Sequence, residues 1–133
     1  MKEGILREAV ALAEKVGHIF VATSDARGLP HMAAAGRVAW KGPRRVAVEA
    51  WFCPGTLANL QGNSHISLVV WDSKADQGYQ LLGEAEKVED LAMLDGYAPS
   101  FEKPVGPQAE RRLFVRVERA LEFQQALHSD AEA

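Results

Sequence analysis

Apolar and polar positions follow two different periods along the chain. Over residues 3–16, apolar side chains recur every three or four positions, which predicts an amphipathic helix that ends at Gly17. After Gly17 the period changes to two, which is typical of strands with one buried face. We therefore expect six strands, at residues 18–23, 31–40, 45–52, 66–71, 79–88 and 111–123.

Shorter elements connect these strands. Thr56 is predicted to be the N-cap of a helix over residues 57–62, and a second short helix is expected over residues 90–97. Three prolines mark residues 98–110 as a loop. We expect residues 123–133 to form a flexible tail. The pattern indicates one domain over residues 1–133, mainly β with short helices (α+β). Closure into an antiparallel barrel would bury its apolar strand faces, although the period alone does not distinguish a barrel from a sandwich.

Composition narrows the class of protein. The chain has 133 residues, of which 47% are hydrophobic and 25% charged, as in ordinary globular domains. A net charge of −3 argues against a nucleic-acid partner bound through its phosphates. One cysteine excludes an intrachain disulfide framework and indicates a reducing compartment. No apolar run is long enough to span a membrane, so we expect a cytoplasmic protein without a membrane partner.

Familiar catalytic motifs are missing from the sequence. It has no glycine-rich phosphate loop and no nucleophile elbow, and its four histidines lack the spacing of metal ligands, so we expect no metal site. Cys53 is expected to be a small buried hydrophobe rather than a redox thiol. Two basic doublets, Arg44 with Arg45 and Arg111 with Arg112, are interpreted as a solvated edge or subunit contact rather than an anion site. No side chain stands out as a general acid or base, so the catalytic residues are unknown.

Three segments, taken in order, resemble a known family. Residues 22–31 (ATSDARGLPH) are similar to its opening A-T-x-x-x-x-G-x-P-H, and residues 56–63 (TLANLQGN) to its helix T-x-x-N-L-x-x-N. Residues 83–88 (GEAEKV) resemble G-x-A-x-x-V at the end of a long strand. In this order and spacing, from about residue 5 to residue 120, they resemble the FMN-binding split barrels of the pyridoxamine 5′-phosphate oxidase-like superfamily, including its small FMN-binding proteins.

The resemblance implies a six-stranded antiparallel split β-barrel with Greek-key-like order. It also implies a homodimer with two FMN sites at the subunit interface. The FMN phosphate would be held by one strand and by the start of the middle helix, and the isoalloxazine ring would pack on another strand. The residues that the resemblance assigns to the cofactor are Ala34, Ala35, Gly36 and Arg37, then Ala50, Trp51 and Phe52, and finally Gly55, Thr56 and Asn59.

The sequence departs from the family at several of these positions. Pro54 and Gly55 stand where family members commonly carry Lys or Arg, and Leu81 stands where many carry a second basic residue. Alternative roles therefore stay open: Arg37 as a salt-bridged surface residue, Thr56 as a helix cap only, and Asn59 and Asn63 as partners of local backbone. The three tryptophans, Trp40, Trp51 and Trp71, are interpreted as core or interface anchors before flavin-stacking groups.

Two classes of function follow. The first is a flavin-linked oxidoreductase or electron-transfer protein that uses FMN and acts on a small-molecule substrate or redox partner. The second is a non-catalytic dimeric split barrel that has lost FMN or binds another pocket ligand, such as F420 or haem.

Overall fold

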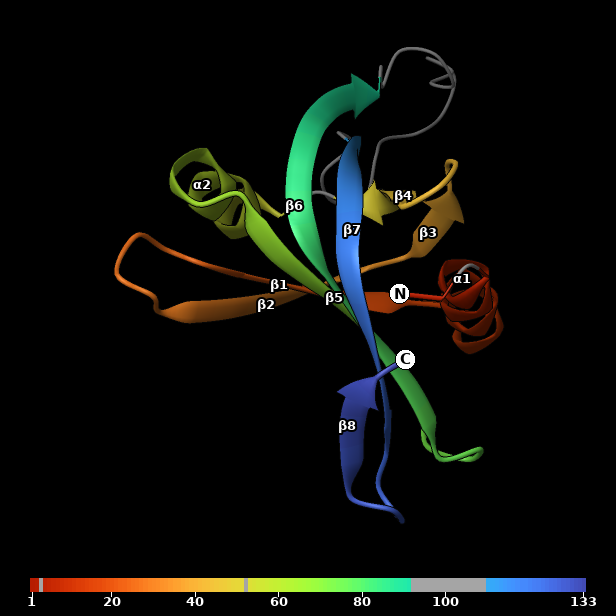
Figure 1. Cartoon of the computed structure of the whole chain (residues 1–133). Helices are drawn as coiled ribbons and strands as arrows, with labels where there is room; N and C mark the ends of the chain where they lie inside the picture. Colours follow the sequence, from red (N-terminus) through yellow and green to blue (C-terminus); the bar gives the residue numbers. More distant parts are fainter. Residues whose placement is uncertain (3, 52, 92–109) are drawn as a thin grey trace, which may run out of the picture.

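The computed structural model describes the chain except for residues 3, 52 and 92–109 (Figure 1). Its elements in chain order are α1 (Ile5–Val16), β1 (Ile19–Ser24), β2 (Pro30–Ala35), β3 (Arg37–Trp40), β4 (Arg45–Trp51), α2 (Pro54–Gly62), β5 (His65–Asp72), β6 (Gln77–Leu91), β7 (Glu110–Gln124) and β8 (Ser129–Glu132).

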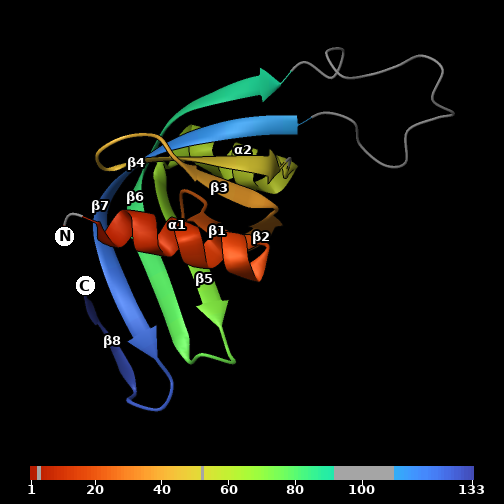
Figure 2. The same cartoon turned by 90° about the vertical axis from the view of Figure 1, so that its right-hand side faces the viewer.

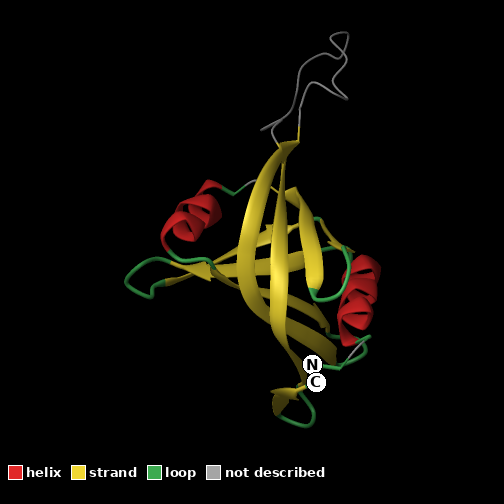
Figure 3. Cartoon of the chain, turned by 45° about the horizontal axis from the view of Figure 1, so that its top comes forward, coloured by secondary structure: helices red, strands yellow, loops and turns green. Residues whose placement is uncertain are grey.

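The expected first helix is present and packs on the strands by its apolar face. Gly4 and Gly17 bound α1, both with left-handed backbone, and the Gly17 amide donates to the Ala13 carbonyl at 2.8 Å. Such a left-handed C-terminal residue is favourable for glycine because it has no Cβ. The buried side chains of α1 are Ile5, Leu6, Ala9, Leu12 and Ala13. Figure 2 shows α1 lying across the strands, and Figure 3 places the two helices on opposite sides of them.

All strand pairings described are antiparallel, in the order β2-β1-β5-β6-β7-β4-β3, with β8 added beside β7. The first and last strands of this order, β2 and β3, are consecutive in the chain, yet no hydrogen-bonded ladder joins them within the described residues. The sheet therefore curls into a barrel that stays open along one seam. This arrangement confirms the expected mainly β, antiparallel split barrel.

The described residues form eight strands, whereas six were expected for the chain. The predicted strand over residues 31–40 divides at Gly36: β2 pairs with β1, whereas β3 pairs with β4. The predicted flexible tail is also wrong in part, because Ser129–Glu132 forms β8 against the end of β7, and the Ala133 amide donates to the Ala120 carbonyl. A short polar strand at a sheet edge has no alternating apolar signal, since neither of its faces is buried.

The middle helix begins earlier than expected. Its N-cap is Cys53 and its first residue is Pro54, so Thr56 lies inside the first turn and is not the cap. Proline suits this first position because its fixed φ is helical and its missing N–H would have no partner there. Of the predicted helix over residues 90–97, Asp90 and Leu91 belong to β6, and the rest lies outside the described residues, as does the predicted loop up to residue 109.

The core fills the barrel between α1 and the inner faces of the strands. Its side chains include Val21, Val46, Leu68, Tyr79, Leu81, Leu113 and Val115. The long strands β6 and β7 pair over most of their length, with register shifts between Leu82 and Gly83 and between Ala85 and Lys87. Among the described residues, no helix is both long and apolar enough to cross a membrane.

Candidate functional site

The residues assigned to the cofactor fall into three groups on different elements. Ala34 and Ala35 end β2, and Gly36 leads into Arg37 at the start of β3. Gly55, Thr56 and Asn59 lie on α2, which packs on the hairpin β1–β2 (Figure 1). Ala50 and Trp51 end β4, whereas Phe52 lies outside the described residues.

Thr56 is the most unusual residue of the second group. Its side chain is 0% exposed, and its Oγ1 has no hydrogen-bond partner among the described residues. A buried hydroxyl without a partner costs about 1–3 kcal/mol relative to a satisfied one. The Leu57 amide makes the first intrahelical bond, to the Cys53 carbonyl at 3.1 Å, so the amides of Gly55 and Thr56 lie before the helical ladder. The first turn of α2 thus gathers two amides without intrahelical partners and one unpartnered hydroxyl.

His31 of β2 packs against this first turn. A Cβ built on Gly55 would lie 2.9 Å from His31 Nε2 and 3.3 Å from Cε1, so the imidazole occupies the space that any larger residue at position 55 would need. The sequence gives no reason to expect this contact, because positions 31 and 55 are far apart in the chain and belong to different elements.

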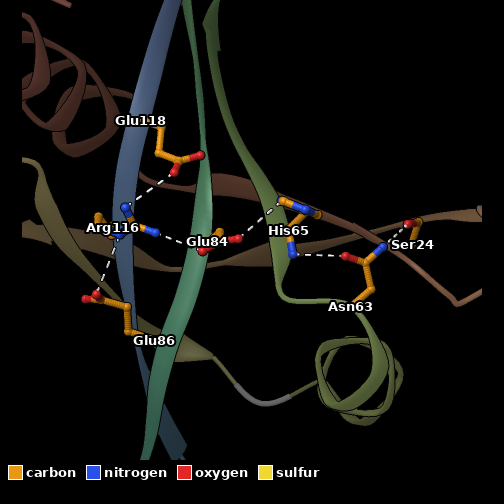
Figure 4. Close-up of polar contacts among 7 residues, drawn as sticks. All are labelled: Ser24, Asn63, His65, Glu84, Glu86, Arg116 and Glu118. Atoms are coloured by element: carbon orange, nitrogen blue, oxygen red, sulfur yellow. Dashed lines mark hydrogen bonds and ion pairs between the residues drawn. The ribbon is translucent and has the colours of Figure 1, made fainter.

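Two asparagines fix α2 on the hairpin and on β5. Asn59 Nδ2 donates to Thr23 Oγ1 at 3.0 Å, and Asn63 Nδ2 donates to Ser24 Oγ at 3.0 Å. Asn63 Oδ1 also accepts from the His65 amide at 3.1 Å, and Figure 4 shows these contacts continuing from His65 toward Glu84. The alternative that the two asparagines only satisfy local backbone is therefore wrong: each donates to a side chain of β1, and Asn63 also accepts from the local His65 amide. These bonds hold the second half and the C-terminal end of α2 against β1 and the start of β5.

Arg37 is held by a buried carboxylate. Arg37 Nε and Nη2 lie 2.9 and 2.6 Å from Glu49 Oε1, and Arg112 Nε lies 2.9 Å from Glu49 Oε2. Glu49 is only 5% exposed. Burial raises the pKa of its carboxyl, but the hydrogen bond from Arg37 and the charges of Arg37 and Arg112 outweigh burial, so the pKa lies below its ordinary value. No hydrogen bond or ion pair joins Arg37 to α2 within the described residues, and the structure supports the interpretation of Arg37 as a salt-bridged residue.

Glu49 and its register with Arg37 were not apparent from the sequence. Arg37 lies directly opposite Glu49 on neighbouring strands, and cross-strand neighbours of opposite charge attract each other. The only sequence signal is an acid inside the apolar run of residues 46–51, which does not reveal its partner.

The other departures from the family receive structural explanations. Leu81 is 1% exposed and belongs to the core, so its position cannot present a charge to a ligand. The basic doublets are engaged by acids and backbone: Arg45 pairs with Glu86 at 2.9 Å, Arg111 pairs with Asp90, and Arg44 donates to the Glu118 carbonyl.

The side chains of Trp40, Trp71 and Cys53 contact other side chains of the fold. Trp71 stacks on Phe123 with ring centroids 5.3 Å apart, and the Arg7 guanidinium lies 3.9 Å from the centroid of the Trp40 ring. Cys53 is half-buried and packs against the core, in line with its interpretation as a small hydrophobe. The side chain of Trp51 is outside the description.

Comparison with known families decides which family this geometry represents. The model of the pyridoxamine 5′-phosphate oxidase family matches residues 5–126. The chain belongs to this family. As a member of the pyridoxamine 5′-phosphate oxidase family, it carries the split barrel that the three sequence segments implied. No curated protein matches its sequence.

Solved structures share the fold at low sequence identity. HupZ of Group A Streptococcus is 22% identical with a TM-score of 0.67, and the match covers 100% of this chain and 99% of HupZ. An FMN-binding protein of Syntrophomonas wolfei subsp. wolfei is 16% identical with a TM-score of 0.65, covering 91% of this chain and 87% of that one. An F420 reductase is 19% identical with a TM-score of 0.64, covering 90% and 98%. At these identities the likeness concerns the fold.

Proposed function

We propose that this chain binds FMN between the start of α2 and strand β2, and that it acts as a flavin-linked oxidoreductase or electron-transfer protein. Its family and the FMN-binding protein of similar fold support flavin as the ligand. The observation that carries the proposal is the buried Thr56 hydroxyl, which has no partner among the described residues and stands in the first turn of a nine-residue helix.

A phosphate group fits the donors gathered there. The N-terminus of a helix attracts anions through its free amides and its dipole. Gly55 and Thr56 supply two such amides, and a phosphate oxygen would accept a hydrogen bond from the Thr56 hydroxyl. The unfavourable burial of this hydroxyl would then end when the ligand binds, since its missing partner would be supplied.

The role of the protein would be to bind and orient the cofactor. Bound FMN supplies the redox chemistry, because its ring accepts and donates hydride or single electrons. Thr56 and the α2 amides would hold the phosphate, and the backbone at the end of β4 would face the ring. Arg37 donates from Nε and Nη2 to Glu49 Oε1. Its Nη1 would therefore be the nitrogen that contacts a ligand.

We also propose that the functional unit is a homodimer. Met32, on the edge strand β2, is 62% exposed, and Leu29, in the turn just before β2, is 68% exposed. Exposed apolar residues on an unpaired strand edge favour association with a partner. A second copy that covers this edge would also close one side of the flavin site.

Titration of the purified protein with FMN tests the proposal. Flavin fluorescence and calorimetric heat should saturate with a Kd of tens of micromolar or below, and sedimentation should give the mass of a dimer. Absence of saturable binding in this range, with the protein folded, would overturn FMN as the ligand.

One alternative has an observation of its own. Gly55 and the buried Leu81 leave two positions without the cations common in the family, which favours a dimeric barrel without FMN. Parallel titrations with FMN and F420 separate the outcomes: a preference for F420 would favour a deazaflavin protein, and binding of neither would favour the non-catalytic barrel.

A further inference from the structure

His31 lies where a charge would act on a ligand at the start of α2. Its Nε2 is the atom closest to the Cβ position of Gly55, 2.9 Å away. The side chain is exposed on β2, and no hydrogen bond or ion pair from it is present among the described residues. The imidazole therefore lies against Gly55 in the first turn of α2, the turn whose Gly55 and Thr56 amides lack intrahelical partners.

Gly55 is needed for this arrangement. Glycine is a poor helix former, and α2 does not require it for a left-handed backbone, because Gly55 is absent from the positive-φ residues. A residue with a Cβ would push the imidazole away from the helix start. Because position 55 has no side chain, the polar group beside the helix start is the His31 imidazole of β2 and not a side chain of α2.

The electrostatics of a helix N-terminus indicate a role for the His31 imidazole. The N-terminus of a helix carries a partial positive charge, so a protonated imidazole beside it is unfavourable on its own. An anion between the imidazole and the amides reverses the sign, because it attracts both. The unpartnered Thr56 hydroxyl in the same turn is a third donor for that anion.

We propose that His31 supplies the cationic contact of the phosphate site, in place of a basic residue on α2. The inference rests on the proposed function and deepens it: the ligand preferred at this site is a phosphate monoester, so the protein selects FMN over riboflavin. In this contact, a protonated His31 imidazole would donate from Nε2 to a phosphate oxygen. The α2 amides and the Thr56 hydroxyl would donate to the phosphate from the other side.

Paired titrations with FMN and riboflavin measure the phosphate contribution in the full-length protein. In the wild type, the ratio of the riboflavin Kd to the FMN Kd should exceed about tenfold, as expected for charge-assisted bonds. His31→Gln keeps a hydrogen-bonding group without charge and should lower this ratio about three- to tenfold, whereas His31→Arg should preserve it.

Two further variants separate position from general damage. Gly55→Ala keeps His31 but displaces its ring and should lower the ratio as His31→Gln does, without loss of thermal stability. His65→Gln is the matched control, because His65 is exposed and follows the opposite end of α2, about 13 Å away along nine helical residues. It should leave the ratio unchanged.

A titration with inorganic phosphate, followed by NMR of the histidine ring signals, keeps the inference testable without flavin. The His31 signals should shift saturably, and those of His65 should not. If both flavins bind and the variants leave their ratio unchanged, the role of His31 is overturned while the proposed function stands. If phosphate shifts His31 but no flavin binds, the anion site is supported and FMN is overturned. If neither binds, both proposals are overturned.

Discussion

Replacement of Glu49 with glutamine tests how strands β3, β4 and β7 are held together beside the open seam. The glutamine keeps the volume of the side chain but removes the charge that Arg37 and Arg112 share at 2.6 and 2.9 Å. Loss of one partner from a fully buried ion pair costs about 3–5 kcal/mol. The Arg37 side chain is 65% exposed, and Arg112 also lies 3.4 Å from Glu89, so both released cations stay partly compensated.

We therefore expect Glu49→Gln to lower the free energy of unfolding by about 2 kcal/mol at pH 7. For a chain of this length that corresponds to a fall in Tm of roughly 5–10 °C. Thermal and urea unfolding at one protein concentration measure the change, since association would shift the apparent stability. The control is Glu118→Gln, a half-exposed carboxylate 3.3 Å from Arg116, which should cost less than about 0.5 kcal/mol.

The effect of Glu49→Gln on the free energy of unfolding should depend on pH. The pKa of Glu49 is lowered in the folded protein by its arginine partners despite burial, so the ionised carboxylate stabilises the fold above the unfolded pKa of about 4.3. This contribution disappears as the pH falls through the lower, folded pKa. The stability gap between wild type and Glu49→Gln should thus be full at pH 7 and narrow below about pH 4. A gap equal to that of Glu118→Gln, or one that does not change with pH, would refute the reasoning.

Four other substitutions have expected outcomes. Gly83→Ala should cost more than about 3 kcal/mol or prevent folding, because a Cβ there would overlap the Arg116 carbonyl, whereas Gly62→Ala has open space and should be neutral or slightly stabilising; urea unfolding compares them. Thr56→Val should raise the free energy of unfolding by about 1 kcal/mol through removal of the unpartnered hydroxyl, yet weaken FMN binding relative to riboflavin; a loss of stability would contradict this account. Asp76→Ala removes the carboxylate that accepts from two backbone amides of the β7–β8 turn, at 2.7 and 3.0 Å, and should increase hydrogen exchange in β8 while β5 stays protected.

The sequence by itself determined the elements whose signal is local. The period of α1 and its closing Gly17 depend on neighbouring residues, and so do the alternating strands and the turn at Asp25, whose carboxylate accepts from the amides of Arg27 and Leu29. The three motif segments also identified the family, because their order along the chain is itself a sequence property.

Only the tertiary structure decided which distant residues meet. Arg37 reaches Glu49 through strand register, and His31 reaches Gly55 through the packing of α2 on the hairpin. The start of α2 was not predicted correctly, because a proline at the first helical position resembles the end of a strand. The edge strand β8 was also not predicted, because an exposed strand lacks an alternating apolar pattern. Contacts of this kind depend on three-dimensional packing between segments, and no local pattern of residues encodes them.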